Sequence, residues 1–193
     1  YNYDIVPKVY RYRDIINGLN EQFHRVYGIE DAEWKHIVVE RYVQDGRLTE
    51  AFNFNLDSLN VTDHMVVNAL GENEKATLYK DQFLPKLKGD TAKFISKFSG
   101  VTDSTVFLME VNRELSAKKI RKVLSDSLEC ITLEENAIYT LLNPFTKQES
   151  QQTLETVAYF AKDIGLVMWY DTKKRSQFEL EEIISQEKWI KLI

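Results

Sequence analysis

Two clusters of basic side chains have the residue types and spacing to do chemistry in this chain. One lies in a segment with helical periodicity and the other in a short turn: Lys118, Arg121 and Lys122, and Lys173, Lys174 and Arg175. Clustered cations bind a nucleic-acid backbone because they release the counterions condensed on its phosphates. Each cluster therefore offers a nucleic-acid contact, and the alternative for each is an ordinary solvated surface.

Catalytic and metal-binding patterns are weak by comparison. His24, His36 and His64 fall in separate segments, and Cys130 stands alone, so no ligand pair has the spacing of a zinc site. Asp103 with Glu110-Val-Asn112 resembles the metal site of restriction-type nucleases, but Asn112 stands where the lysine would be. The 7 glycines do not form a phosphate-binding loop. We expect no catalytic residue, no cofactor and no metal.

Composition narrows the class of protein further. The chain has 193 residues, 44% of them hydrophobic, and 25 basic against 30 acidic side chains give a net charge of −5. No overall positive field draws it to DNA or to an anionic membrane. A single cysteine and no recognisable leader indicate an intracellular protein, and we expect it in the cytoplasm. The first residue is Tyr1 rather than Met, which predicts a fragment of a larger multidomain protein.

Aromatic side chains give the chain a second kind of candidate site. Large rigid rings anchor protein interfaces, and four of them lie near the two ends: Trp34, Trp169, Tyr170 and Trp189. Burial in the core is the alternative for most of them. If exposed, they predict a protein partner or a homo-oligomer.

The first half of the chain predicts a helix followed by a β-hairpin. Apolar residues recur every three or four positions over 9–27, up to Gly28, which is typical of an amphipathic helix. In the next segment Asp45-Gly46 provides a type I′ turn. Pairing across this turn matches Val43 with Leu48, Arg41 with Glu50, Val39 with Phe52, and Ile37 with Phe54. A helix over 32–43 is the alternative.

The middle of the chain predicts mostly helices. Apolar spacing and Gly or Pro stops favour helices over 62–70, 74–84, 91–99 and 117–128, with a strand over 105–110. Thr132 with Glu135, and Thr146 with Glu149, have the spacing of capping boxes. They predict two further helices, the second with an apolar stripe from Leu154 to Ile164.

The last fifty residues have the sequence outline of a winged helix. The helix ends at Gly165, a strand covers 166–170, the basic turn covers 171–176, a second strand covers 177–180, and a helix containing Trp189 follows. Residues 152–193 resemble the winged-helix segment of the COR domain of ROCO proteins and related multidomain signalling ATPases. The resemblance is carried by Ile164-Gly165, Leu166 to Tyr170, and Trp189-Ile190, with Glu187 where the family has proline. It implies a regulatory scaffold without catalytic residues.

The sequence thus predicts an α+β, mostly helical fold in two regions. Residues 1–104 would form an N-terminal α+β region, and residues 105–193 a helical region ending in the winged helix. We expect a non-enzymatic regulatory module that acts through protein–protein contacts and is not a membrane protein. The alternative is a winged-helix nucleic-acid-binding protein, a replication initiator or transcription regulator that uses the basic wing.

Overall fold

The computed structural model describes residues 3–18, 20–32, 34–85, 87–102 and 104–193. Within these ranges the chain forms one β-sheet and a five-residue helix. The elements are β1 (Lys8–Asp14), β2 (Glu21–Glu30), β3 (Lys35–Val43), β4 (Leu48–Asn55), β5 (Val61–Val67), β6 (Asn73–Lys75), β7 (Thr77–Asp81), β8 (Thr91–Ser99), β9 (Val106–Val123), β10 (Asp126–Leu142), β11 (Glu149–Ala161), β12 (Gly165–Asp171), β13 (Gln177–Ser185) and α1 (Gln186–Ile190).

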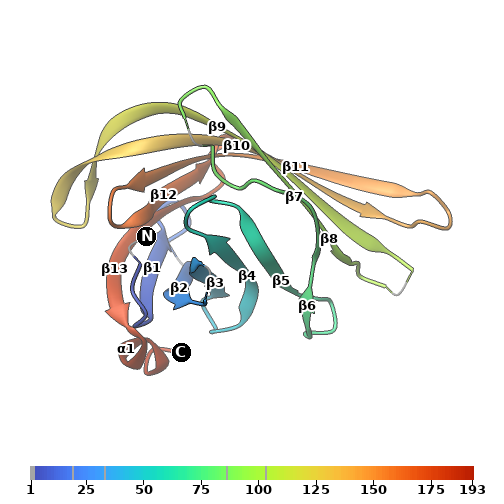
Figure 1. The fold of residues 1–193 in the computed structure, drawn as a ribbon, viewed down its shortest axis with the longest axis horizontal. Coiled ribbons are helices and arrows are strands. Elements are labelled where there is room, and N and C mark those ends of the chain that lie inside the picture. Colours follow the sequence, from blue (N-terminus) through green and yellow to red (C-terminus); the bar gives the residue numbers. More distant parts are fainter. Residues whose placement is uncertain (1–2, 19, 33, 86, 103) are drawn as a thin grey trace.

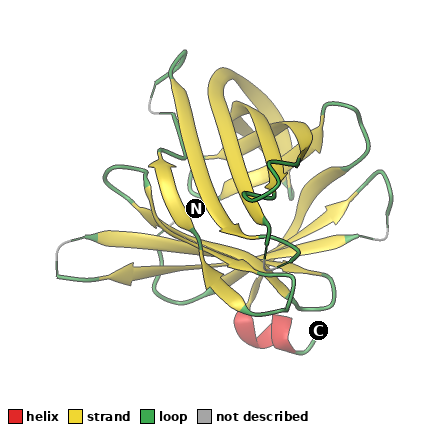
Figure 2. Ribbon diagram, turned by 90° about the vertical axis from the view of Figure 1, so that its right-hand side faces the viewer, coloured by secondary structure: helices red, strands yellow, loops and turns green. Residues whose placement is uncertain are grey.

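The sheet has 13 antiparallel strands and curls into a nearly closed barrel (Figures 1 and 2). Almost every strand pairs with its neighbours in sequence, in the order β6-β5-β4-β3-β2-β1-β13-β12-β11-β10-β9-β8-β7. The pairing of β1 with β13 joins the beginning of the chain to its end. Asp14 supports this junction, since its carboxylate accepts hydrogen bonds from the backbone of Ile16 and of Gln177, which begins β13.

The two edges of the sheet meet along a seam between β5 and β7. β6 and β7 follow one another in the chain on either side of Ala76. β6 pairs with β5 on one side of the seam, and β7 pairs with β8 on the other. Among the described residues, a single isolated backbone bridge, Asn60 to Gln82, adds to this pairing. Side chains contribute as well, because Nδ1 of His64 lies 3.0 Å from the Ser96 hydroxyl of β8. Side-chain hydrogen bonds therefore contribute, together with this bridge, to closing the barrel at the seam.

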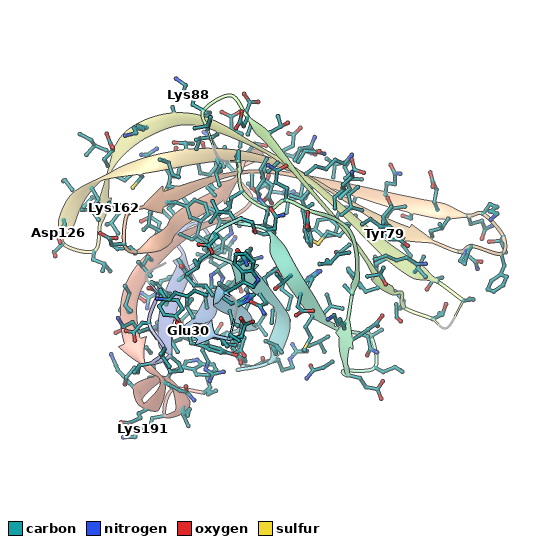
Figure 3. All side chains as sticks on the ribbon, viewed as in Figure 1. Glu30, Tyr79, Lys88, Asp126, Lys162 and Lys191 are labelled. Carbon is teal, nitrogen blue, oxygen red and sulfur yellow. The ribbon has the colours of Figure 1, made fainter. Side chains whose placement is uncertain are left out.

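Aromatic and aliphatic side chains fill much of the space inside the curved sheet (Figure 3). One buried cluster joins β4 and β5 to β8, β9 and β10, and contains Phe52, Val61, Phe83, Phe94, Met109, Val111 and Ala137. A larger cluster joins β1–β3 to β9–β13. Both clusters draw on strands far apart in sequence, so the core forms only when the whole sheet has assembled.

The prediction of a mostly helical α+β fold is wrong. The segments 9–27, 62–70, 74–84, 91–99 and 117–128 lie mainly in strands, and so do the helices predicted after Thr132 and Thr146. The physical reason is that several strands bury residues on both faces, so their apolar positions do not alternate simply. In β1, for example, Val9 packs with Trp189 on one face while Tyr12 packs in the main core on the other. Such a pattern imitates the spacing of three and four residues typical of a helix.

Gly28 and the predicted capping box of Thr132 with Glu135 are also typical helix signals, although both lie in strands. Gly28 lies inside β2 rather than ending a helix, and an added Cβ would come within 2.5 Å of the Tyr3 ring. Thr132 is a buried strand residue, and Glu135 forms an ion pair with Arg113 instead of capping a helix. Glycine is needed in β2 because an aromatic ring packs directly on the backbone there.

The winged helix predicted at the C-terminus is also wrong. The stripe from Leu154 to Ile164 lies in or just after β11, where successive residues point to opposite faces. Leu154 belongs to one core cluster, while Tyr159 and Ala161 are buried in the other. The strand, turn, strand and Trp-containing helix that follow are present as β12, β13 and α1, but they extend the sheet and form no separate wing.

The predicted hairpin is confirmed as β3 and β4. Arg41 pairs with Glu50, and the predicted pairs of Val39 with Phe52 and of Ile37 with Phe54 are also present. The predicted pair of Val43 with Leu48 is shifted, because a bulge after Arg41 places Tyr42 opposite Leu48. Gly46 has a positive φ of +79°, but Asp45 does not have the positive φ that a type I′ turn also requires, so the predicted turn type is wrong although the hairpin is present. The helix considered for 32–43 is therefore excluded over β3.

The boundary predicted at 104/105 lies in the turn between β8 and β9, and strands from both sides belong to the same sheet. None of the helices in the described residues is long and apolar enough to cross a membrane.

Candidate ligand-binding site in the barrel interior

Two adjoining cavities lie inside the barrel. One, of about 280 Å³, is lined by charged, polar and aromatic side chains, and the other, of about 190 Å³, is mostly apolar. They share four lining residues: Arg41, Phe83, Phe160 and Leu166. Taken together, the two cavities fall within the size range of ordinary small-molecule sites, which occupy roughly 300–1,000 Å³.

The first ion pair of the polar cavity joins β3 to β4. Arg41 and Glu50 are directly opposite in the hairpin, and Arg41 Nη1 lies 2.7 Å from Glu50 Oε1. The other carboxylate oxygen of Glu50 lies 3.4 Å from Nε2 of His64. Burial alone would raise the pKa of Glu50, but the charge of Arg41 and the contact with His64 outweigh it and hold the pKa at about 2. Glu50 is therefore ionised at neutral pH.

The second ion pair joins β9 to β10. Arg113 and Glu135 are cross-strand partners, and Oε2 of Glu135 lies 2.7 Å from Nε and 2.6 Å from Nη2 of Arg113. The Thr156 hydroxyl donates to the other oxygen of Glu135 at 3.4 Å. Burial lowers the pKa of Arg113 and the nearby charge of Arg41 adds to that effect, while Glu135 opposes both. The two guanidinium groups therefore act on one another across the same interior.

Phe83 positions the second pair from the loop between β7 and β8. Its ring centre lies 3.6 Å from Cζ of Arg113, and its carbonyl oxygen accepts a hydrogen bond from Arg113 Nη1 at 3.1 Å. The same ring packs against Phe52, Phe54 and Phe94. Phe83 thus reaches into the barrel and separates the charged end of the interior from the apolar end, while Lys88 of the same loop lies at the outer edge of the molecule (Figure 3).

Three further side chains bring hydrogen-bonding groups to the polar cavity. The Gln22 amide, the Tyr139 hydroxyl and the Trp169 indole N–H line it, and within the described residues none of these groups has a hydrogen-bond partner. Burial and the charges of Glu50 and Glu135 raise the pKa of Tyr139 to about 12, so its hydroxyl remains protonated. All three side chains are half-buried rather than enclosed, and their polar groups open onto the cavity. These three are therefore available to a bound molecule.

His24 and Trp169 form an aromatic wall of the same cavity. Their ring centres are 5.6 Å apart and nearly parallel, and the Trp169 ring stacks on Phe178 from β13 with centres 4.8 Å apart. Burial and the neighbouring charge of Arg41 place the pKa of His24 well below its usual value, although Glu50 opposes the shift. His24 is therefore neutral near pH 7 and adds no charge to the cavity.

The apolar cavity continues the interior toward the seam. Its wall consists of β3 and β4 side chains, the turn between β4 and β5, and the loop after β7: Ile37, Val39, Phe52, Phe54, Leu56, Leu59 and Leu84, together with the four shared residues. Arg41 is the charged member of this wall. The cavity suits a hydrocarbon group of modest size.

The predicted nucleic-acid-binding residues lie at two places in the described structure, each with acidic side chains nearby. Lys173, Lys174 and Arg175 are exposed in the turn between β12 and β13, where Arg175 forms an ion pair with Asp171. On β9, Lys118 pairs with Glu129, and the Arg121 guanidinium lies over the Tyr159 ring. Arg121 and Lys122 line a hollow whose other walls include Glu179 and Glu181. Acidic side chains thus accompany the basic ones, and nucleic-acid binding stays an untested prediction.

The predicted interface aromatics are mostly packed inside the protein. Trp169 lines the cavity, Trp189 is 5% exposed between Phe23 and Tyr42, and Tyr170 is half-buried. Trp34 is 47% exposed in the turn before β3. A protein partner or a homo-oligomer stays a prediction that none of these positions tests.

No three His, Cys, Asp or Glu side chains in the described residues are grouped so that they could hold a metal ion. Cys130 is buried as a thiol. Tyr1, and Asp103 of the nuclease-like pattern, lie outside the described residues.

The residues that line the polar cavity were missed as a site, although one signal was present in the sequence. The predicted hairpin register already placed Arg41 opposite Glu50 on the face that carries Val39 and Phe52. An ion pair on an otherwise apolar strand face indicates a charged group inside the protein. Arg113 and Glu135 gave no comparable signal, because Arg113 lies between the strand predicted over 105–110 and the helix predicted over 117–128, and Glu135 lies in a segment predicted as a helix.

Comparison with known proteins shows similarity of fold to two solved structures. No family model and no curated protein matches the chain. A solved structure of a protein inferred to be exported, with a YmcC-like fold, from Bacteroides fragilis NCTC 9343 is similar over 95% of this chain and 98% of its own, with a TM-score of 0.54 and 12% identity. A protein inferred to be a lipoprotein, from Parabacteroides distasonis ATCC 8503, covers 94% and 97%, with a TM-score of 0.53 and 11% identity.

These likenesses define the chain as a YmcC-like β-barrel in fold. They also contradict the expected cytoplasmic location and the intracellular assignment, because one neighbour is described as exported and the other as a lipoprotein. The sequence argument failed because a single buried cysteine forms no disulfide in any compartment, so it does not distinguish one compartment from another.

Proposed function

We propose that this protein binds a small amphipathic molecule inside its barrel. The apolar part of the ligand lies in the cavity around Phe52, Phe54 and Leu84, and its polar part lies against the two Arg–Glu pairs. The observation that carries this proposal is the set of unpartnered polar groups on Gln22, Tyr139 and Trp169, which face a cavity adjoining an apolar one. The descriptions of the two neighbours support a place outside the cytoplasm for this role.

Binding of a neutral fluorescent hydrocarbon probe, N-phenyl-1-naphthylamine, tests the proposal. Its fluorescence should rise on addition of the protein and saturate at one probe per chain. Leu84→Trp should lower the affinity for the probe at least tenfold, because Leu84 lines the apolar cavity and the larger indole ring would fill that space.

Leu87→Trp is the matched control, since Leu87 lies on the same loop but is 69% exposed and outside the cavity wall. It should bind the probe like the unaltered protein. Absence of saturable binding to the unaltered protein, or equal weakening by both substitutions, would overturn the proposal.

A further inference from the structure

The charges around the polar cavity cancel. Two guanidinium groups, Arg41 and Arg113, face two carboxylates, Glu50 and Glu135, in two separate pairs. The remaining titratable groups in the wall are neutral at pH 7: His24 because its pKa is lowered, and Tyr42 and Tyr139 because theirs are raised to about 12. The wall therefore has no excess charge to offer an ion.

An ionic ligand group would lose its hydration on entering this cavity without gaining an uncompensated partner. Transfer of an isolated charge out of water is far less favourable than transfer of a neutral polar group. An anion would meet Glu50 and Glu135 beside each arginine, and a cation would meet the arginines. A neutral head group does not have this disadvantage.

The same wall is rich in hydrogen-bonding positions. Each carboxylate has one oxygen held closely by arginine and a second whose partner is 3.4 Å away, His64 for Glu50 and Thr156 for Glu135. Those second oxygens can accept hydrogen bonds from ligand hydroxyls. The Tyr139 hydroxyl and the Trp169 N–H can donate hydrogen bonds to ligand hydroxyls. The Gln22 amide can both donate and accept them.

The indole ring adds a flat apolar surface to these polar groups. Trp169 is fixed by stacking on Phe178 and His24, so its orientation is set before any ligand enters. A ring that bears hydroxyls on its edges and C–H groups on its faces matches such a wall.

We infer that the head group bound in the polar cavity is a neutral, hydroxyl-bearing one, a sugar or polyol linked to an apolar chain. This inference rests on the proposed function, because it names the chemistry of the ligand at the same site.

Displacement of N-phenyl-1-naphthylamine by three compounds with the same eight-carbon chain tests the head group. Octyl β-glucoside, octanoate and octylammonium are compared at pH 7, each below its micelle concentration. Octyl β-glucoside should displace the probe at a concentration at least tenfold lower than either ion. Equal or better displacement by octanoate or octylammonium would overturn the inference and leave the proposed function standing. If none of the three displaces the probe, the proposed function fails with it.

Tyr139→Phe provides a second readout that does not depend on the stability of an ion pair. It removes a hydroxyl that has no partner among the described residues, so the fold should be kept. The octyl β-glucoside affinity should fall about threefold to tenfold, with the octanoate affinity unchanged. Tyr79→Phe on β7, where the ring is 58% exposed, is the control and should change neither. An unchanged glucoside affinity in Tyr139→Phe would contradict the assigned head-group position.

Discussion

At the scale of one residue, Glu50 shows why a carboxylate inside the barrel stays ionised. Its carboxylate is held between Arg41 of β3 and His64 of β5, and part of its side chain, 22%, remains exposed. Burial opposes ionisation, whereas the neighbouring positive charge favours it, and the second effect is larger. The folded protein therefore binds a proton at Glu50 less readily than the unfolded chain does.

Replacement of this carboxylate should make the protein less stable at neutral pH. In Glu50→Gln the interior ion pair with Arg41 is lost, and the free energy of unfolding should fall by about 3 kcal/mol. Since the pKa of Glu50 is about 2 in the folded protein against 4.5 ordinarily, its stabilising effect is present above pH 4.5 and is lost as the pH falls toward 2. The variant should thus show a smaller loss of stability over that range, measured by denaturant unfolding.

Glu129→Gln is a suitable control, because Glu129 pairs with Lys118 on the surface and both side chains are more than 60% exposed. Its effect should stay below about 1 kcal/mol. If Glu50→Gln is no more harmful than this control, the interior pair does not carry the role assigned to it.

The residues of the site were only partly predictable from the sequence. Arg41 and Glu50 could be placed opposite each other because Asp45-Gly46 defines a local turn and hence a register. Arg113 and Glu135 are 22 residues apart, on the long strands β9 and β10. No turn signal in the sequence sets the register of such strands over that length. A charged residue at an inward position also interrupts the alternating apolar pattern of the strand, so that the pattern looks like that of an amphipathic helix.

At the scale of elements, the seam is the part of the wall with the least backbone pairing. Residues 60–62 of the β5 side and 78–81 of the β7 side enclose an open hollow rather than a continuous ladder. Leu56 and Leu59, in the turn that leads into β5, belong to the wall of the apolar cavity. The hollow at the seam therefore lies next to the β4–β5 turn that forms part of the cavity wall.

A covalent lock across the seam should slow ligand exchange. The paired positions Asn60 and Gln82 can be changed to cysteine together, and the oxidised protein should exchange N-phenyl-1-naphthylamine at least tenfold more slowly in stopped-flow measurements. Reduction should restore the rate, because it frees the two edges to separate.

Met65→Cys with Lys75→Cys is the matched control, since this pair joins β5 to β6 where the backbone is already paired. Its oxidation should leave the exchange rate unchanged. An equal rate before and after oxidation of the Asn60 and Gln82 pair would show that ligands enter elsewhere.

Elements with a local cause were predicted well. The hairpin of β3 and β4 follows from its turn, and β12 and β13 from the flanking Gly165 and the basic turn. The predicted helix containing Trp189 is present as α1, where the Ser185 side chain accepts a hydrogen bond from the backbone of Lys188. The predicted strand at 105–110 corresponds to the start of β9. Most of the remaining strands also pair with their neighbours in sequence, but burial on both faces gives them the apolar spacing of a helix, so periodicity alone misassigned them.

At the scale of the whole molecule, the regions 1–104 and 105–193 contribute to one sheet. β1 needs β13, and β8 needs β9, so each region contains strands whose partners lie in the other. The expected result is a single cooperative unfolding transition for the full chain, observed by calorimetry.

Fragments 1–104 and 105–193 should each be unfolded when produced alone, as measured by circular dichroism and amide exchange. Two separate transitions, or a stable fold in either fragment, would instead support the division into two regions predicted from the sequence.

The pairing of the first strand with the last also governs the order of events during synthesis. While a nascent chain leaves the ribosome, Lys8–Asp14 lacks one of its two neighbours until Gln177–Ser185 has emerged. Contacts that span nearly the whole length form slowly, since a long loop must close before they stabilise anything. The ladder between β1 and β13 therefore forms last, after the hairpins between neighbouring strands and only when nearly the whole chain has been translated.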